Sequence, residues 1–344
     1  MTDAATGRPA VPMEPLMELI GGALAFTVLR AAVDVGVFEH VDGTSDVAAI
    51  ARESKADERG TRLLLEALAA VGMLESGDGG GYRLSPLADA TLVSGRPAYF
   101  GGLIRWMGGL LEQAGPHMAD AVRRGGGVLE EDVLAQLGLW EDFAGASAAM
   151  AGAVAGALTD ILSPFLAGRS DAVEILDVAC GSGLYGLTVA GRHPAARVTL
   201  NDWAEVLERT RATAERLGLA QQTTYLPGNV FEIPLGGPYD VIVASNFFHA
   251  LSEDQSRQLL LRLAAALRPD GRLAIQGPMV VGSPAEDRFP RLLSMLLLTV
   301  TPGGEAHAVA TYERLFADAG LTLVEAHDLP GMGAFHSVIA TRRP

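Results

Sequence analysis

Two hydrophobic patterns divide the chain, a helical one in the first half and an alternating one in the second. Apolar residues recur at helical spacing over 18–41 and predict an amphipathic helix. Two more helices are expected over 46–51 and 56–73, the second with Asp57 as its N-cap, and a glycine-rich hairpin follows over 74–84. Helix, helix and hairpin in this order are typical of a winged helix.

The second half predicts a different architecture. Residues 96–166 are again helical and rich in Ala, Gly and Met, but after Gly168 short apolar runs alternate with helical segments. Strands are expected over 173–178, 197–201, 223–226, 239–244 and 271–275, and helices over 184–192, 205–217 and 254–267. This alternation predicts a doubly wound parallel sheet. The order helix, strand, strand over 312–341 predicts an antiparallel pair that closes the sheet.

Composition and charge narrow the functional classes. The chain has 344 residues, of which 49% are hydrophobic and 19% charged, so it can fill a large core. Its 26 basic and 41 acidic residues give a net charge of −15, and the helix over 56–73, which would be the recognition helix of a winged helix, is not basic. A dimerisation role is therefore favoured over DNA binding, and no nucleic-acid partner is expected.

Three further features of the sequence argue against other classes of protein. They are the single lysine, the single cysteine and the length of the apolar stretches. Lys55 is the only lysine and lies far from any glycine-rich loop, which argues against a P-loop and a Schiff base. The single cysteine, Cys180, and the lack of zinc-finger spacing fit a reducing cytoplasm. Apolar stretches are broken before the ~20 residues that a bilayer needs, and residues 1–12 carry no signal pattern. We therefore expect a soluble, cytoplasmic protein with no membrane partner.

A small-residue loop follows the first strand of the alternating half. The segment Asp-Val-Ala-Cys-Gly-Ser-Gly over 177–183 would let a ligand approach the carboxyl end of that strand. The residues from Gly181 to Gly186 also fit the pattern G-x-G-x-x-G, so a nicotinamide enzyme stays an alternative. Asp177 distinguishes a nicotinamide cofactor from one with a methionine moiety. Its carboxylate would repel the pyrophosphate of the first but would suit the ammonium group of the second.

Polar residues also end the next two strands. Asp202 could accept hydrogen bonds from both ribose hydroxyls, Trp203 offers an aromatic face to an adenine, and Asn229 could bind the adenine amino group. Asp177, Asp202 and Asn229 are separated from one another by about one α/β unit, as the ligand sites of consecutive units should be. The structural alternatives are a helix N-cap for Asp202 and a turn residue for Asn229.

These segments resemble class I S-adenosylmethionine-dependent methyltransferases, and more narrowly the bacterial small-molecule O-methyltransferases with an N-terminal winged-helix dimerisation domain. The motifs that carry the resemblance are EILDVACGSG at 174–183, NDWAEVL at 201–207, PGNVFE at 227–232, YDVIVASNFFH at 239–249, LRPDGR at 267–272, TPGG at 301–304 and YERLFADAG at 312–320. The resemblance implies an α/β fold with a Rossmann-like doubly wound sheet and a mainly α-helical winged-helix domain. It also implies three parts: a dimerisation domain over 1–95, a helical linker and pocket cap over 96–168, and a catalytic domain over 169–344.

The resemblance also implies the binding residues and partners. The cofactor, S-adenosyl-L-methionine, would be held by Asp177, Ala179, Gly181, Gly183, Asp202, Trp203, Asn229, Val230, Phe231 and Ser245. The acceptor pocket would include Trp106, Phe143, Met150, Asn246, Met295 and His307. The expected partners are a small-molecule substrate and a second copy of the chain.

One histidine is the candidate catalytic residue. In this family a histidine after the fourth strand removes a proton from the acceptor hydroxyl, beside an acidic residue and with a later glutamate to orient it. His249 stands at the histidine position, but Ala250 replaces the acidic residue and Ala306 stands at the glutamate position. His249 is expected to act as base or to contact the acceptor, with a pKa near the ordinary ~6.5. His117 and His307 could share its cavity, but no metal is expected.

The sequence therefore predicts methyl transfer from S-adenosylmethionine to an aromatic or polyketide-like hydroxyl in secondary metabolism. The departures at Ala250 and Ala306 keep open an enzyme of the same fold that uses the cofactor without methyl transfer, as a decarboxylase, hydroxylase or cyclase. A C- or N-methyltransferase is a further alternative, and a ligand-sensing winged-helix regulator a less favoured one.

Overall fold

The computed structural model describes residues 12–41, 46–77, 81–127, 139–169, 172–329 and 335–342, with the side chains of Ser76, 139–150 and Ala153 outside that description. The chain divides into two compact units, one up to Gly109 and one from Leu110.

The first unit contains the predicted helices and hairpin. Its elements are α1 (Glu14–Val35), η1 (Val37–His40), α2 (Val47–Glu53), α3 (Glu58–Ala70), β1 (Leu74–Ser76), β2 (Tyr82–Leu84), α4 (Pro86–Thr91) and the larger part of α5 (Gly101–Ala114). Asp46 and Asp57 are the N-caps of α2 and α3, and each accepts a hydrogen bond from a backbone N–H three residues later. The expected order of helix, helix and antiparallel hairpin is confirmed.

Helix α1 buries only the residues near its end. Ala32 and Val33 join the core of the first unit, whereas the apolar side chains nearer its start, such as Leu19 and Leu24, are 59% and 64% exposed. By length and composition α1 could cross a membrane, although only 11% of its most apolar window is buried in this unit. Glu18 and Arg30 interrupt the apolar run within this helix, so its uncharged part is shorter than the ~20 residues that a bilayer needs.

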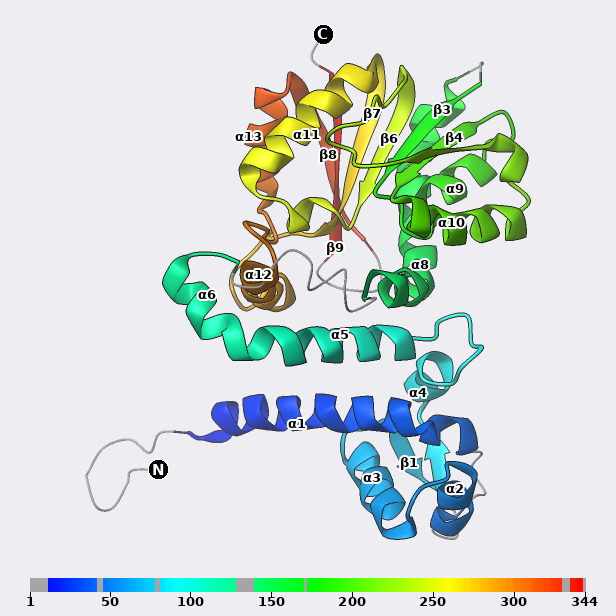
Figure 1. Ribbon diagram of the computed structural model, residues 1–344, viewed down its shortest axis with the longest axis vertical. Helices are drawn as coiled ribbons and strands as arrows, with labels where there is room; N and C mark the ends of the chain where they lie inside the picture. The colour runs from blue at the N-terminus through cyan, green and yellow to red at the C-terminus, as the bar shows by residue number, and fades with distance from the viewer. Residues whose placement is uncertain are drawn as a thin grey trace. The chain divides into compact units, whose positions relative to one another are not determined.

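The second unit holds a seven-stranded sheet in the order β5-β4-β3-β6-β7-β9-β8 (Figure 1). The strands are β3 (Glu174–Val178), β4 (Arg197–Asp202), β5 (Thr223–Pro227), β6 (Tyr239–Ser245), β7 (Leu267–Pro278), β8 (Leu321–Asp328) and β9 (Phe335–Arg342). Strands β3 to β7 pair in parallel, and β9 pairs antiparallel with both β7 and β8. The predicted parallel sheet with an antiparallel closing pair is confirmed.

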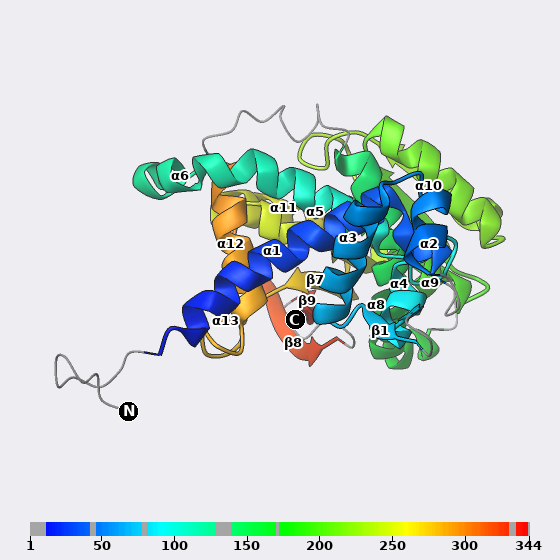
Figure 2. The same ribbon diagram turned by 90° about the horizontal axis from the view of Figure 1, so that it is seen from below.

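Helices cover both faces of this sheet. The helices of the second unit are α6 (Met118–Arg124), α8 (Leu139–Ala167), α9 (Leu184–Gly191), α10 (Ala204–Arg216), α11 (Glu253–Ala266), α12 (Arg288–Val300) and α13 (Val309–Asp318), with the short turns η3 (Gly115–His117), η4 (Ala220–Gln222) and η5 (Phe248–Ala250). Figures 1 and 2 show α9 and α10 on one side of the strands and α11 and α13 on the other. Helix α12 had not been predicted.

Side chains alternate between two cores. Ile175, Val243 and Ala274 pack in a cluster with α8 and α9, and we call this side of the sheet the α8 face. Leu176, Ala244 and Ile275, their neighbours along the strands, pack with α11 and α13 on the α11 face. This alternation follows from the two-residue period of a strand and fixes which way each functional side chain on the sheet points.

Candidate active site

The strand order reverses at β3, which has β4 on one side and β6 on the other. In open α/β sheets such a switch point forms a ligand crevice at the carboxyl ends of the strands. Asp177 lies at the end of β3, Asp202 ends β4 and Ser245 ends β6. The topology therefore brings these three predicted residues to one edge of the sheet.

The loop after β3 has a left-handed backbone at several positions. Ala179, Gly181 and Gly183 have φ values of 49°, 53° and 74°. A Cβ on Gly183 would lie 2.7 Å from the Thr210 side chain, so packing requires glycine there, whereas a Cβ on Gly181 would meet nothing within 4 Å. Gly181 thus leaves open space beside the loop, as a ligand-binding position should.

Asp202 fixes this loop to the next strand. One carboxylate oxygen accepts a hydrogen bond from the Gly181 N–H at 2.8 Å, and the other accepts one from the Trp203 N–H at 2.8 Å. Trp203, not Asp202, is the N-cap of α10, so the N-cap alternative does not describe Asp202. Each carboxylate oxygen has a second lone pair, so Asp202 can still accept from ribose hydroxyls. The Trp203 side chain is 58% exposed.

Asn229 forms a turn with its own side chain. Its Oδ1 accepts a hydrogen bond from the Phe231 N–H at 3.0 Å, and its Nδ2 donates to Glu232 at 3.1 Å. The turn alternative therefore describes its present hydrogen bonds, and contact with an adenine would use the remaining lone pair of Oδ1. Val230 is buried beside it.

Asp177 is a buried carboxyl group with an incomplete set of partners. Its Oδ2 accepts a hydrogen bond from the Gly186 N–H at 2.8 Å, while its Oδ1 is buried with no partner in the structure. Burial raises the pKa of Asp177 to about 8, and the charge of Asp202 adds to that rise. Because Asp177 occupies the Gly186 N–H, that group is not available to a pyrophosphate, which weakens the dinucleotide alternative.

His249 lies in η5, directly beyond the carboxyl end of β6. Burial, followed by the nearby His307, lowers the pKa of His249 to about 4. The expectation of an ordinary imidazole pKa was therefore wrong, because sequence alone does not reveal burial. A Cβ on Gly277 would lie 3.5 Å from His249 Nδ1, and within the described residues the His249 ring makes no hydrogen bond. His249 is thus a neutral, weakly basic imidazole at pH 7.

Alanines occupy the two positions at which the family has carboxylates beside this histidine, Ala250 and Ala306. Ala306 is buried, and its N–H donates to Ser294 Oγ at 3.0 Å. His307 is also buried, with Nε2 3.0 Å from the Leu251 carbonyl oxygen and its ring edge-on to Tyr312. His307 therefore packs against the segment that carries His249, and its contact with an acceptor stays a prediction.

The structure describes only some of the remaining predicted acceptor residues. Asn246, at φ 54°, donates from Nδ2 to the Tyr185 hydroxyl at 3.3 Å, and Met295 is half-buried on α12. The side chains of Phe143 and Met150, on α8, lie outside the described residues, and Trp106 belongs to the first unit. Across the residues that are described, no group of three His, Cys, Asp or Glu side chains could hold a metal ion.

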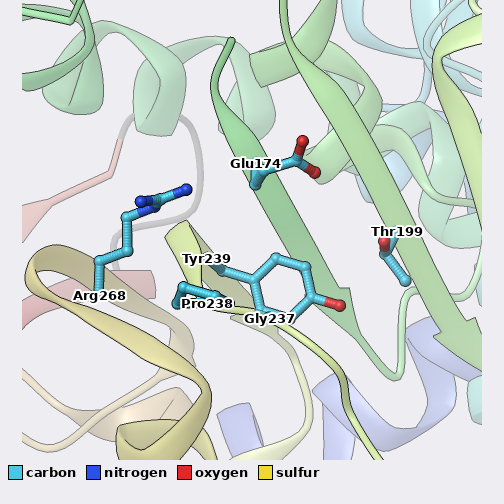
Figure 3. A pocket seen from close by; sticks show the side chains of 6 residues that line it. All are labelled: Glu174, Thr199, Gly237, Pro238, Tyr239 and Arg268. Carbon is cyan, nitrogen blue, oxygen red and sulfur yellow. The ribbon is translucent and has the colours of Figure 1, made fainter. Parts of the chain in front are cut away.

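A cavity of about 300 Å³ lies away from this edge of the sheet. Figure 3 shows the side chains that line it, which are Glu174, Thr199, Gly237, Pro238, Tyr239 and Arg268. Glu174 and Tyr239 begin their strands, so this cavity opens near the amino ends of the sheet. It is therefore separate from the candidate active site.

Comparisons with known proteins identify the family. A methyltransferase domain matches residues 175–271, and an O-methyltransferase dimerisation domain matches residues 17–94. Acetylserotonin O-methyltransferase of Mus musculus molossinus is 30% identical over 98% of this chain and 91% of its own length. The chain belongs to the S-adenosylmethionine-dependent O-methyltransferases.

Other relatives of this O-methyltransferase come from bacterial biosynthesis. The tetracenomycin polyketide synthesis 8-O-methyltransferase of Streptomyces glaucescens is 28% identical over 88% of this chain and 89% of its own. Aclacinomycin 10-hydroxylase of Streptomyces purpurascens is 26% identical over 94% and 89%. A crystal structure of a candidate O-methyltransferase from Nostoc punctiforme superposes with a TM-score of 0.86 at 25% identity, over 96% of this chain and 99% of that one.

The residues at the switch point fit S-adenosylmethionine, the cofactor of the family. The unpartnered Oδ1 of Asp177 offers a carboxylate to an ammonium group, and a cation there would offset the cost of burying a charged carboxylate. Open space at Gly181 and the exposed ring of Trp203 suit the nucleoside part. Gln276 was not among the predicted site residues, although a glutamine at the end of the apolar run Leu-Ala-Ile in β7 is an unusual residue for a buried strand.

Proposed function

We propose that this enzyme transfers a methyl group from S-adenosylmethionine to a hydroxyl of an aromatic or polyketide-like small molecule in secondary metabolism. The observation that carries the proposal is the position of His249, which lies directly beyond β6, the strand next to β3 with its Asp177. The names of the relatives support the acceptor class, since they include an acetylserotonin and a polyketide O-methyltransferase.

The cofactor residues act by binding and orientation. Asp177 would hold the ammonium group, Asp202 the ribose hydroxyls, and Asn229 with Phe231 the adenine. Bound S-adenosylmethionine supplies a methyl group already activated by the sulfonium. Most of the catalysis then comes from holding the acceptor oxygen in line at about 3 Å and excluding water.

His249 would accept the acceptor proton or hold the hydroxyl. A phenol has a pKa of about 10, roughly six units above that of His249, so full proton transfer before methylation would cost about 8 kcal/mol. Proton transfer is therefore expected to accompany methyl transfer, or the acceptor is already acidic. With no orienting carboxylate among the described neighbours of His249, alignment of the acceptor carries more of the rate than general base catalysis does.

A homodimer is the proposed assembly. The exposed apolar side chains of α1, which include Leu16, Leu19, Ile20 and Leu24, form a face too apolar to remain in water. This helix lies within the segment that matches the O-methyltransferase dimerisation domain. We infer that a second copy of the chain covers this apolar face of α1. We also propose that the enzyme works in the cytoplasm.

One alternative has a specific observation in its favour. A relative that aligns over most of the chain is a hydroxylase, and the departures at Ala250 and Ala306 fall on residues that assist proton removal. The same fold could therefore use S-adenosylmethionine without moving its methyl group, or methylate carbon or nitrogen.

A panel of phenolic acceptors tests the proposal. The enzyme is incubated with S-adenosylmethionine and each acceptor, and S-adenosylhomocysteine and the acceptor are followed by mass spectrometry. We expect S-adenosylhomocysteine to form together with an acceptor heavier by one CH₂ unit. An acceptor that gains oxygen or loses carbon dioxide, with no S-adenosylhomocysteine, would establish the alternative.

A further inference from the structure

Three buried polar side chains on neighbouring strands lack hydrogen-bond partners. Gln276 of β7 is 1% exposed, and neither its amide oxygen nor its amide nitrogen has a partner in the structure. The hydroxyls of Ser245 on β6 and Ser337 on β9 are likewise buried and unpartnered. Native proteins contain few such groups, so three in one place require an explanation.

The three residues form one continuous row. Ser245 pairs with Gln276 across β6 and β7, and Gln276 pairs with Ser337 across β7 and β9. Ser245 follows Val243 by two residues, Gln276 follows Ala274 by two, and Ser337 precedes Ile339 by two, so all three lie on the α8 face. We call Ser245, Gln276 and Ser337 the polar row.

The polar row lies on the side of the site where the acceptor is expected. In the sheet, β7 and β9 lie beyond β6, away from the strands β3 and β4 that carry Asp177 and Asp202. Gly277, the residue after Gln276, faces the α11 side of β7, and its Cβ would lie 3.5 Å from His249 Nδ1. The polar row and the candidate base therefore lie on opposite faces of β7 near the same edge of the sheet, and an acceptor that reaches both would pass over that edge.

An aromatic pair stands next to the polar row. Phe335 precedes Ser337 by two residues on the same face of β9, and its ring stacks on Phe289 of α12 with centroids 6.5 Å apart and an interplanar angle of 27°. Flat rings of this kind suit an aromatic ligand. Polar groups beside an apolar, aromatic wall are typical of small-molecule sites.

We propose that the polar row recognises a carbonyl group and a neighbouring hydroxyl on the aromatic acceptor, at a distance from the hydroxyl that is methylated. The Gln276 amide nitrogen donates to the carbonyl oxygen, and its amide oxygen accepts from the neighbouring hydroxyl. Ser337 supplies a further donor on one side of Gln276, and Ser245, on the other side, separates Gln276 from the strands that carry the cofactor residues. The inference rests on the proposed function and narrows its acceptor to a hydroxylated quinone or aryl ketone.

Two probes of similar size test this recognition. Emodin carries a ring carbonyl flanked by hydroxyls, and resveratrol is a polyphenol without a carbonyl. Dissociation constants of both are measured by calorimetry for the full-length enzyme saturated with S-adenosylhomocysteine. We expect the wild type to prefer emodin by about tenfold or more, the effect of one or two hydrogen bonds.

Gln276→Leu replaces the amide by an apolar group of similar shape. It should abolish the preference by weakening emodin binding about tenfold, with resveratrol and S-adenosylhomocysteine bound as before. Its Tm should stay level or rise, because an unpaired amide is removed from the core. Ser337→Ala should act in the same direction to a smaller extent.

The matched control is Ser256→Ala, which removes an equally buried and unpartnered hydroxyl on α11 and should leave both dissociation constants unchanged.

Binding and turnover separate the two proposals. A wild type without preference for emodin, or a Gln276→Leu enzyme that keeps it, would overturn the recognition and leave a row that holds only buried water. An emodin preference that depends on Gln276, with no methyl transfer to emodin when S-adenosylmethionine replaces S-adenosylhomocysteine, would support the recognition and contradict the proposed function.

Discussion

Asp177 gives the sharpest prediction, because its carboxyl group must lose a proton to bind a cation. Burial raises its pKa to about 8 in the free protein, so at pH 6.5 the group is almost entirely protonated. An ammonium group is attracted only to the carboxylate. Binding of the cofactor should therefore release nearly one proton per site at this pH.

The magnitude follows from the size of the shift. Below the free-state pKa of about 8, each pH unit lowers the carboxylate fraction tenfold, which costs about 1.4 kcal/mol of binding free energy. Affinity for S-adenosylhomocysteine, which carries the same ammonium group and is stable, should rise about 100-fold between pH 5.5 and 7.5. Above pH ~8 the gain should stop, because Asp177 is then already a carboxylate in the free protein.

Calorimetry in buffers of different ionisation enthalpy measures both quantities. At pH 6.5 a plot of apparent binding enthalpy against the ionisation enthalpy of the buffer should have a slope whose magnitude is close to one, which corresponds to one proton released per site. Asp177→Asn should bind more weakly at pH 7.5 and show neither the pH slope nor the proton release. A wild-type affinity that stays constant between pH 5.5 and 7.5, or a slope that survives in Asp177→Asn, would refute the assignment of Asp177 to the ammonium group.

Three further predictions concern the rest of the site and the assembly. Asp202→Ala should weaken S-adenosylmethionine binding by about 2–4 kcal/mol in a folded protein, measured by calorimetry, and tight NAD binding by the wild type would contradict the cofactor assignment. His249→Ala should lower kcat by roughly 10² with cofactor affinity nearly unchanged. At saturating cofactor, kcat/KM of the wild type for the acceptor should fall only below a pH near 4, since burial lowers the pKa of His249 to about that value; a decline centred near pH 6.5 would show that His249 is not the group that titrates. Sedimentation should show a dimer, and Leu19→Glu with Leu24→Glu on α1 should shift it to monomer, whereas a monomeric wild type would exclude the proposed interface.

The second unit follows closely from patterns that act over short distances. The alternation of apolar runs with helical segments located every strand of the parallel sheet, and the final helix, strand and strand located the antiparallel pair. The N-cap role of Asp57 could also be predicted from local sequence, since a carboxylate directly before a helix accepts a hydrogen bond from a backbone N–H of the first turn. Helix α12 was missed, because its apolar residues follow a loop with no clear cap and its Pro290 obscures the start.

The properties of the site depended on tertiary structure that no local pattern encodes. The positions of Asp177, Asp202 and His249 at one edge of the sheet could be predicted, because parallel strands end together. The pKa values of Asp177 and His249 could not, since burial causes both shifts and depends on segments distant in sequence. Gln276 was overlooked for the same reason: only the pairing of β6, β7 and β9 places it between two serines.

The central claim, that this chain moves a methyl group from S-adenosylmethionine to an acceptor oxygen, is tested most directly with a labelled cofactor. Full-length enzyme is given S-adenosylmethionine with a trideuteriomethyl group and emodin, and the product is analysed by mass spectrometry and NMR. We expect one trideuteriomethyl ether for each S-adenosylhomocysteine formed. An acceptor that leaves the reaction changed but unlabelled, or labelled on carbon, would contradict it.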